Sequence, residues 1–192
     1  MSNPSEFDKV QRFARAQQER EEQITRGLML SGKRIIELGL VQNLQDQKEQ
    51  IQPAGVDFTL KQLATFASPG VIDLDNTRRV LPGYNAIEFD DDMVNLLQGV
   101  YLVEFNETVS LPNNVIGLMR TRSSVFRSGA VLTAGVIDPG YSGAVGALLQ
   151  IGSEHGISLT RNAKLAQWVF AEVGDPPEEG YSGVYKDAKR MF

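Results

Sequence analysis

The stretch RTRSSVFRSGAVLTAGVIDPGYSG, residues 120–143, decides how the fold of this chain is interpreted. Its first ten residues contain three arginines, and no acidic residue occurs between Glu107 and Asp138, although the 192-residue chain has a formal net charge of −5. Guanidinium groups beside serine hydroxyls can donate several directed, charge-assisted hydrogen bonds to phosphate oxygens. The same local pattern is also typical of surface ion pairs on a β-turn, and these residues alone leave both interpretations open.

The second half of this stretch, residues 133–143, predicts a tight hairpin. Asp138 is followed by Pro-Gly, and Tyr141 stands between two glycines. Glycine permits positive φ and lets other groups approach the backbone closely. An aromatic ring at this place could cover a ring-shaped ligand, and the carboxylate could bind a hydroxyl or activate water. Ordinary turn chemistry explains the same residues.

The rest of the chain from Ile51 onward indicates β-structure, because short apolar runs alternate with Pro, Gly, Asn and Asp. Strands are expected over residues 100–105, 115–119, 144–151, 157–159 and 164–173, with turns at 111–114 and 138–140. Many short strands separated by turns predict a mainly β fold, a barrel or jelly roll, and not a sheet of βαβ units.

The N-terminal part is expected to be helical and the C-terminal part irregular. One helix is expected over residues 5–29, and a second from Ser31 to Leu38 with Ser31 as N-cap and Gly39 as the stop. Residues 42–50 are polar and are expected to form a loop. The tail from Gly174 is rich in Pro, Gly and charge, and is expected to be mobile until something orders it.

The composition excludes several classes of site. The chain contains no cysteine and one histidine, His155, so it has no disulfide framework, thiol nucleophile, thiolate metal site or multi-histidine zinc site. Zinc-dependent nucleoside deaminases are therefore excluded, and any metal is held by oxygen ligands, which favours Mg²⁺ or Ca²⁺. His155 is expected to be exposed, Trp168 to lie in the core or a subunit interface, and the acidic run at residues 90–92 to be a solvated edge.

The hydropathy and the charge of the chain bear on its location and on its class of partner. No apolar run approaches the roughly 20 residues that span a bilayer, and the polar N-terminus lacks the apolar core of a signal peptide. We therefore expect a cytoplasmic protein. The acidic balance argues weakly against a nucleic-acid polymer as partner.

Taken together, the two halves of residues 120–143 resemble the dUTPase and dCTP deaminase superfamily: Arg-Ser-Ser, then about fifteen residues, then Gly-Val-Ile-Asp-x-Gly-Tyr-x-Gly. Further segments resemble the superfamily's other motifs in the same order. These are PAGVDF at 53–58, KLAQWVF at 164–170, LSGKRI at 30–35 and the ending GYSGVYKDAK at 180–189. The chain looks closest to the archaeal-type dUTP diphosphatases of the dCTP deaminase-like branch.

The resemblance implies a homotrimer of distorted jelly-roll β-barrels with sites between subunits, each closed by a C-terminal lid. It implies a helical extension over residues 1–28, the barrel domain over 29–173 and the lid or tail over 174–192. The ligand would be a deoxyribonucleoside triphosphate with Mg²⁺. Uracil would be recognised largely by backbone groups of the hairpin over 133–146.

The resemblance also implies a role for each matching residue. Asp138 would touch the sugar 3′-hydroxyl and activate the attacking water, Tyr141 would pack near the deoxyribose, and Asp57 would help hold Mg²⁺ through water. The expected phosphate-binding residues are Arg122, Ser123, Ser124 and Gln167, with Arg127 assisting. The lid candidates are Tyr185 and Lys189.

One position separates the two chemistries that the superfamily contains. Its deaminase branch has a glutamate ten residues after the aspartate of Ile-Asp-Pro-Gly, and this glutamate carries protons. Here that position is Leu148, and no acidic residue lies between Asp138 and Glu154. Leucine cannot move protons. We therefore expect a dUTP diphosphatase, with a dCTP deaminase or bifunctional enzyme, and a non-catalytic nucleotide-binding regulator, as the alternatives.

Overall fold

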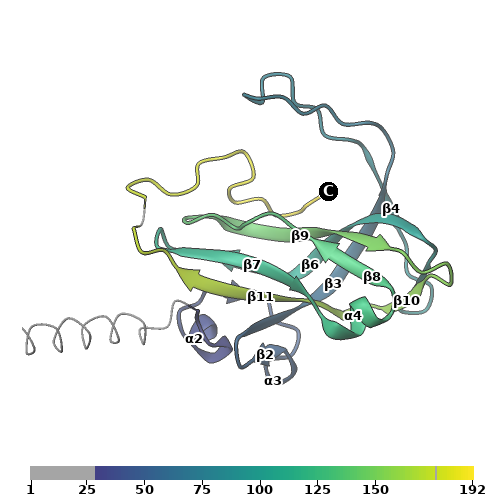
Figure 1. The fold of residues 1–192 in the computed structure, drawn as a ribbon, viewed down its shortest axis with the longest axis horizontal. Helices are drawn as coiled ribbons and strands as arrows, with labels where there is room; N and C mark the ends of the chain where they lie inside the picture. Colours follow the sequence, from purple (N-terminus) through teal and green to yellow (C-terminus); the bar gives the residue numbers. More distant parts are fainter. Residues whose placement is uncertain (1–28, 176) are drawn as a thin grey trace, which may run out of the picture.

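The computed structural model describes residues 29–175 and 177–192 (Figure 1). The helix expected over residues 5–29 and the extension over 1–28 therefore lie outside the described residues, apart from Met29, which forms an isolated β-bridge with Ala171. Within the described ranges, no helix is long and apolar enough to cross a membrane.

Strands dominate the described chain, as the sequence predicted, and they curl into a nearly closed barrel (Figure 1). The strands are β1 (Val41–Gln42), β2 (Ile51–Gln52), β3 (Gly55–Phe66), β4 (Tyr84–Ile87), β5 (Met93–Leu96), β6 (Gly99–Ser110), β7 (Val115–Thr121), β8 (Ala130–Thr133), β9 (Ser142–Ile151), β10 (Ile157–Thr160) and β11 (Lys164–Glu172). The helices are α2 (Gly32–Glu37), α3 (Gln47–Gln50) and α4 (Ser123–Arg127). All five strands expected from the sequence are confirmed, in β6, β7, β9, β10 and β11.

The main sheet is antiparallel and runs in the order β7-β11-β3-β6-β9-β8, while β5 and β10 form a separate two-stranded sheet. The two strands at the ends of this order, β7 and β8, are joined by the side chain of Thr121. The Thr121 hydroxyl donates to the Leu132 carbonyl and accepts from the Leu132 amide, both at 3.0 Å. This contact joins β7 to β8 and closes the barrel around its core.

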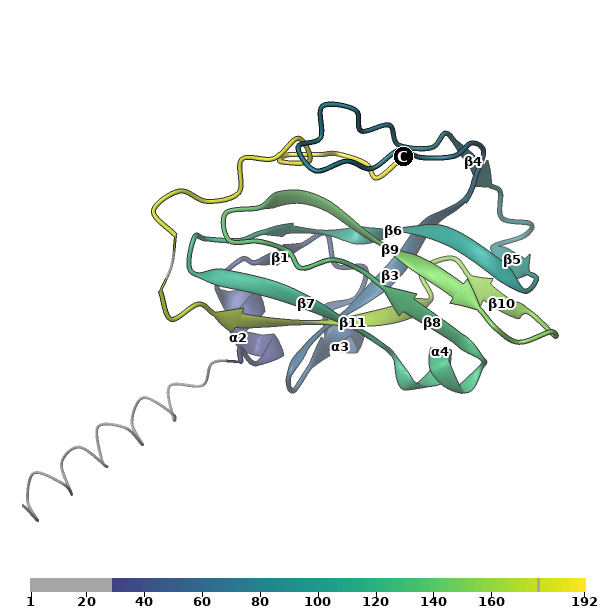
Figure 2. The ribbon, with the colours of Figure 1, turned by 45° about the horizontal axis from the view of Figure 1, so that its top comes forward.

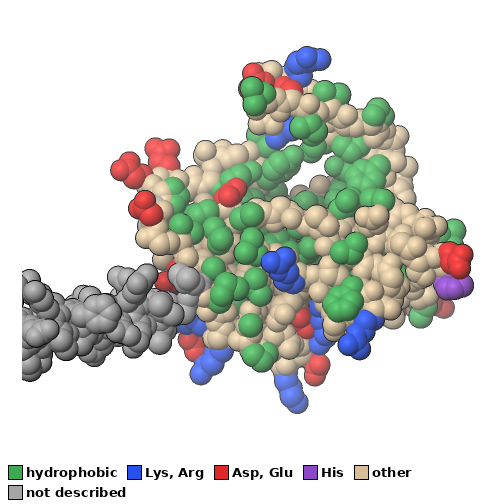
Figure 3. Space-filling view, viewed as in Figure 1, with side chains coloured by type: hydrophobic (Ala, Val, Ile, Leu, Met, Phe, Trp, Pro, Cys, Tyr) green, Lys and Arg blue, Asp and Glu red, His purple; other side chains and the backbone are tan. Residues whose placement is uncertain are grey.

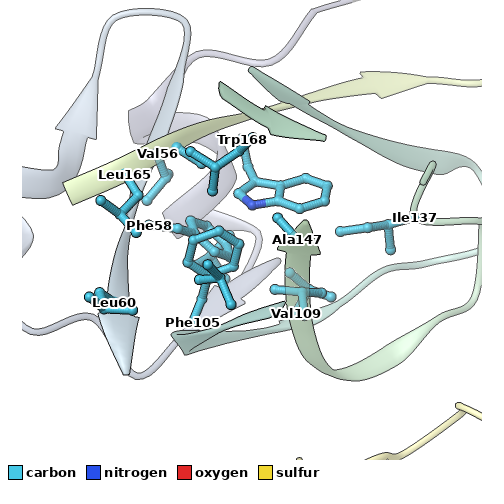
Figure 4. Packing of buried hydrophobic residues seen from close by; sticks show 14 of the residues in the cluster. Val56, Phe58, Leu60, Phe105, Val109, Ile137, Ala147, Leu165 and Trp168 are labelled. Carbon is cyan, nitrogen blue, oxygen red and sulfur yellow. The ribbon is translucent and has the colours of Figure 1, made fainter. Parts of the chain in front are cut away.

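Large aromatic side chains fill the barrel (Figure 4). The ring of Phe58 lies 5.8 Å from that of Phe105, edge to face, and 5.8 Å from that of Trp168. Trp168 is 1% exposed, which confirms that it belongs to the core. Such edge-to-face and tilted pairs add to the burial of apolar area in fixing one packing arrangement.

The two helices before the barrel begin at side-chain caps. Ser31 accepts from the Arg34 amide at 3.2 Å, and Gly39 has φ of 67°, so the predicted cap and stop of α2 are confirmed. The loop expected over residues 42–50 is partly wrong, because its end forms α3. There the Asp46 carboxylate accepts from two amides of the first turn, at 2.9 and 3.2 Å, which is the contact that starts a short helix.

An arm, residues 67–83, projects from the barrel between β3 and β4 (Figure 1). Val71 and Val80 pair across it, with N···O distances of 2.8 and 2.9 Å. The C-terminal tail runs beside the arm (Figure 2), and the Arg79 guanidinium lies 5.4 Å from the centroid of the Tyr185 ring. Figure 3 shows hydrophobic side chains on the facing sides of the arm and the barrel, with a hollow between them.

A buried carboxylate ties α3 to the barrel. Glu107 is 0% exposed and accepts three hydrogen bonds: from the Gln50 amide at 2.7 Å, the Thr59 backbone amide at 2.7 Å and the Thr59 hydroxyl at 2.6 Å. Burial raises the pKa of Glu107, and these donors oppose the rise. Both carboxylate oxygens are occupied, so the network needs a side chain that has two acceptors.

We predict that Glu107→Gln lowers the free energy of unfolding by about 1–3 kcal/mol, because the new amide NH₂ faces a buried donor. Urea unfolding followed by tryptophan fluorescence measures the change. The matched control is Glu88→Gln at an exposed position, which should change nothing. An unfolding midpoint for Glu107→Gln equal to that of the control would contradict the role given to this network.

Candidate functional site

A cavity of about 340 Å³ lies between the hairpin before β9 and the C-terminal tail. Its walls are residues 134–138, Tyr141 and residues 144–146, with Trp168 on the barrel side. The tail supplies Tyr181, Tyr185, Ala188, Arg190 and Met191. Small-molecule sites typically occupy roughly 300–1,000 Å³ and are lined mainly by apolar and aromatic side chains, so the cavity is suited to such a ligand.

The hairpin is held on the barrel by backbone pairing, which fixes where Asp138 lies. Ile137 and Gly117 exchange two hydrogen bonds of 3.0 Å, and the Tyr141 amide then donates to the Asp138 carbonyl at 3.2 Å. Gly140, with φ of 77°, allows this turn. The predicted tight turn is therefore present, and it leaves Asp138 exposed at the rim of the cavity.

Tyr141 forms a fixed part of the cavity wall. Its side chain is buried, its hydroxyl donates to the Ala144 carbonyl at 2.6 Å, and its ring meets that of Tyr181 edge to face at 5.4 Å. Burial, with smaller effects from Tyr181 and Asp187, raises the pKa of Tyr141. The hydroxyl therefore stays protonated and keeps its donor role, and the ring presents a rigid apolar surface to the cavity.

A second group of expected site residues surrounds the start of α4. Arg122 Nε lies 3.1 Å from Asp57 Oδ2, and Arg122 Nη1 donates to the Lys164 carbonyl at 3.2 Å. Lys164 Nζ lies 3.7 Å from the same Asp57 oxygen. Gln167 on β11 stands opposite Asp57 in the sheet and beside Arg120 on its other side.

The remaining arginine and serines of this group face solvent. Ser123 and Ser124 form the first turn of α4 and Arg127 its last residue, and all three are exposed. Arg122 is the N-cap residue of the helix, so the guanidinium and both hydroxyls start from adjacent positions. The structure thus brings the Arg-Ser-Ser segment, Gln167 and Asp57 together in one basic region.

Asp57 is the charge partner of this region. Its side chain is 3% exposed, and burial raises its pKa, while the cations of Arg122 and Lys164 oppose that rise. Its Oδ2 accepts no hydrogen bond of acceptable geometry despite the short distance to Arg122. The carboxylate therefore neutralises and orients two cations that would otherwise repel each other.

The two groups lie far apart on one chain. Ile137, next to Asp138, pairs with Gly117 near the start of β7, whereas Arg122 follows the end of the same strand. Extended backbone rises about 3.3 Å per residue, so the five residue steps from Gly117 to Arg122 span roughly 16 Å. The structure brings Asp138, Tyr141 and Tyr185 together, and separately Asp57, Arg122, Ser123, Ser124 and Gln167.

Among the described residues, no group of three or more His, Cys, Asp or Glu side chains could hold a metal ion. Asp57, expected to help hold Mg²⁺ through water, lies beside the cations of Arg122 and Lys164. The acidic run is exposed as expected, and Asp92 Oδ1 lies 3.4 Å from Arg161 Nε. His155 is also exposed, as expected, with a side-chain exposure of 89%.

Four residues near these groups were not singled out as site residues from the sequence. Tyr181 and Arg190 line the cavity, and so does Trp168, while Lys164 joins the basic region. Tyr181, Lys164 and Trp168 stand inside the quoted motifs, so the motifs could have indicated them, whereas Arg190 lies outside the motifs. Lys189, expected in the lid, is exposed, and its neighbours Ala188 and Arg190 line the cavity in its place.

A protein-family model described as dCTP deaminase-like matches residues 21–173. Among similar curated proteins, one from Methanosarcina acetivorans, named "Probable deoxyuridine 5'-triphosphate nucleotidohydrolase", is 40% identical over 149 residues. The match covers 77% of this chain and 87% of that protein. A protein of the same name from Archaeoglobus fulgidus is 40% identical over 162 residues, with 82% and 95% covered.

A third relative, from Methanocaldococcus jannaschii, is named "Deoxyuridine 5'-triphosphate nucleotidohydrolase" and is 37% identical over 142 residues, with 73% of this chain and 89% of that protein covered. Among solved structures, the 2'-deoxycytidine 5'-triphosphate deaminase from Agrobacterium tumefaciens matches with a TM-score of 0.57 at 20% identity. This match covers 76% of this chain and 48% of that chain. The structural match confirms the expected fold and, at this identity, nothing beyond the fold.

Proposed function

The chain belongs to the dCTP deaminase-like family, and from this membership we propose that it is a dUTP diphosphatase, which hydrolyses dUTP to dUMP and pyrophosphate. The observation that carries this choice is the set of ionisable groups at the cavity. Among the described residues that line it, Asp138 is the one carboxylate. Leu148, where deaminases of this family have a proton-carrying glutamate, is aliphatic and pairs with Leu102 in the sheet.

The wall of the cavity suits recognition of a base by backbone groups. Residues 134–137 and 144–146 are all small or aliphatic, so they offer no side-chain hydrogen bond to the polar edge of uracil. Backbone amides and carbonyls are the strong hydrogen-bonding groups that remain on these segments. The Tyr141 ring would then lie against the deoxyribose, where an added 2′-hydroxyl would be crowded.

The basic region is the proposed triphosphate site, and it belongs to a neighbouring subunit. One chain holds Asp138 and the Arg122 group roughly 16 Å apart along β7. A homotrimer with sites between subunits brings one chain's cavity beside another chain's Arg122, Ser123, Ser124 and Gln167. Guanidinium and hydroxyl donors there would bind the phosphate oxygens, with Arg127 assisting.

The proposed reaction needs mainly positioning and one proton acceptor. A water oxygen forms a bond to phosphorus while the bond between the α- and β-phosphates breaks, and pyrophosphate leaves. Asp138, exposed at the rim, takes the proton of the water. Because Asp57 faces two cations, the described residues do not offer a carboxylate cage for Mg²⁺. The ion would reach the site on the triphosphate, and no step is assigned to it.

The first experiment incubates the protein with dUTP or dCTP and Mg²⁺ and follows pyrophosphate and ammonia. We expect pyrophosphate from dUTP and no ammonia from dCTP, since the cavity lacks the second proton carrier. Ammonia from dCTP would overturn the assignment in favour of a deaminase. Tight nucleotide binding without turnover would instead indicate a regulator.

We predict that Asp138→Asn lowers kcat for dUTP by about 10²–10⁴-fold, the usual size of a general-base contribution, without changing the oligomeric state. Steady-state kinetics and size-exclusion chromatography measure both. Asp175→Asn, an exposed position that does not line the cavity, is the control. Near-normal turnover by the Asp138 variant would remove this residue from the mechanism.

We also predict that Arg122→Ala weakens binding of a non-hydrolysable dUTP analogue by at least about tenfold, because charge-assisted contacts to the phosphates are lost. The effect on dUMP binding should be smaller, since dUMP has one phosphate. Titration followed through Trp168, the sole tryptophan and a cavity residue, gives both affinities. Equal triphosphate affinity in variant and wild type would refute the phosphate role.

A further inference from the structure

The C-terminal tail is attached to the barrel by backbone hydrogen bonds, with an isolated parallel β-bridge between Ala188 and Gly143. The Tyr181 amide donates to the Pro139 carbonyl, the Asp187 amide to the Ser142 carbonyl, and Ala188 accepts from the Ala144 amide, each at 2.7 Å. The first half of β9 is free to receive it, because β8 pairs only with residues 148–151 of that strand. The tail therefore pairs with the open edge of β9 at the place where it covers the cavity.

Two glycines of β9 leave the space that the tail fills. A Cβ atom on Gly143 would lie 2.9 Å from the Ala188 carbonyl oxygen, and one on Gly146 would lie 2.9 Å from Met191 Cγ as well as 2.4 Å from the Val103 carbonyl oxygen of β6. Gly143 also has φ of 140°, which favours glycine. The surface of β9 thus accepts the tail in one register, down to the penultimate residue of the chain.

The end of the tail binds a buried charge. Glu104, opposite Gly146 in the sheet, is 0% exposed, and its Oε2 accepts from the Met191 amide at 3.1 Å. Its Oε1 pairs with Lys61. The pairing of β3 with β6 shifts register between Leu60 and Gln62, so Lys61 is the extra residue of a bulge, which can aim its side chain at Glu104.

We propose that Glu104, paired with Lys61, is the anchor that holds the C-terminal tail closed over the cavity, and that it is a positioning residue for nucleotide hydrolysis. The second half of this proposal rests on the proposed function. A buried carboxylate requires partners. One of the two partners of Glu104 is the backbone amide of Met191, the penultimate residue. The hydrogen bond from Met191 to Glu104 therefore fixes the end of the tail on the barrel wall beneath the cavity.

The Lys61 side chain makes the anchor reversible. It is 41% exposed and lies on the barrel, so it stays with Glu104 whether the tail is docked or not. The carboxylate therefore keeps its countercharge when the tail leaves, and remains a charged acceptor ready to bind the Met191 amide again. Two aromatic contacts support the docked state: the ring of Phe192 lies 5.7 Å from that of Tyr84, and Tyr185 lies under Arg79.

The test removes the donor and leaves the carboxylate in place. Met191→Pro deletes the amide hydrogen at a position near the chain end, where misfolding of the barrel is not expected. The matched control is Val184→Pro. Val184 follows Gly183 in a turn closed by the Lys186 amide, and within the described residues its own amide donates no hydrogen bond. Proline suits this turn position.

Limited trypsin digestion followed by intact mass measures tail opening without reference to activity. Cleavage after Lys186 and Lys189 should be about tenfold faster in Met191→Pro than in wild type, and unchanged in Val184→Pro. Glu104→Gln, which keeps the size and one acceptor, should accelerate cleavage by a smaller factor. Equal cleavage rates in wild type and Met191→Pro would refute the anchor.

Kinetics with dUTP tests the positioning role separately. If a docked tail is the binding-competent state, KM rises in inverse proportion to the docked fraction, with a smaller change in kcat. A synthetic peptide of residues 180–192 gives the cleavage rate of an undocked tail and hence the docked fraction of each variant. A Met191→Pro tail that is cleaved as fast as this peptide, with unchanged KM and kcat, would keep the anchor and refute its role in hydrolysis. A wild-type protein that does not hydrolyse dUTP would refute the proposed function, and the digestion result would still decide the anchor.

Discussion

The structure depends on β3, a strand that is buried along both faces for most of its length. Its alternate residues Val56, Phe58 and Leu60 lie in the aromatic core. The residues that follow each of them, Asp57, Thr59 and Lys61, are polar and make their contacts away from this core. Each is matched by a different segment: Asp57 by Arg122 and Lys164, Thr59 by Glu107, and Lys61 by Glu104. Buried polar groups must be satisfied, so these contacts fix where the segments lie.

This constraint explains how one strand connects the parts of the proposed enzyme. Asp57 orients the cations of the basic region, and Lys61 supports the carboxylate that receives the end of the tail. Between them, Thr59 ties β3 to Glu107 on β6 and, through Gln50, to α3. The basic region, the Glu107 network and the tail anchor proposed at Glu104 are therefore contacted in turn by the polar residues of one strand, whose other side is the aromatic core.

The sequence predicted the strands that have clear apolar runs and turn residues at their ends. It did not indicate β3 as a strand, although residues 56–61 alternate apolar and polar side chains. That alternation is typical of a strand with one solvent-facing side, so the pattern gives no sign that Asp57 and Thr59 are buried. The motifs grouped Arg122 with Asp138 in function, but only the pairing of Ile137 with Gly117 shows how far apart one chain holds them. The anchor at Glu104 was out of reach as well, since its partners are 43 and 87 residues away in the chain.

In the proposed trimer, a complete site combines the Asp138 half of one subunit with the Arg122 half of another. Refolding an equal mixture of the Asp138→Asn and Arg122→Ala chains tests it directly. In randomly mixed trimers, about a quarter of the sites contain both unaltered halves, so dUTP hydrolysis should recover to roughly that fraction of wild type. Activity no higher than that of the two variants refolded separately would show that each site is built within one chain, and would contradict the account.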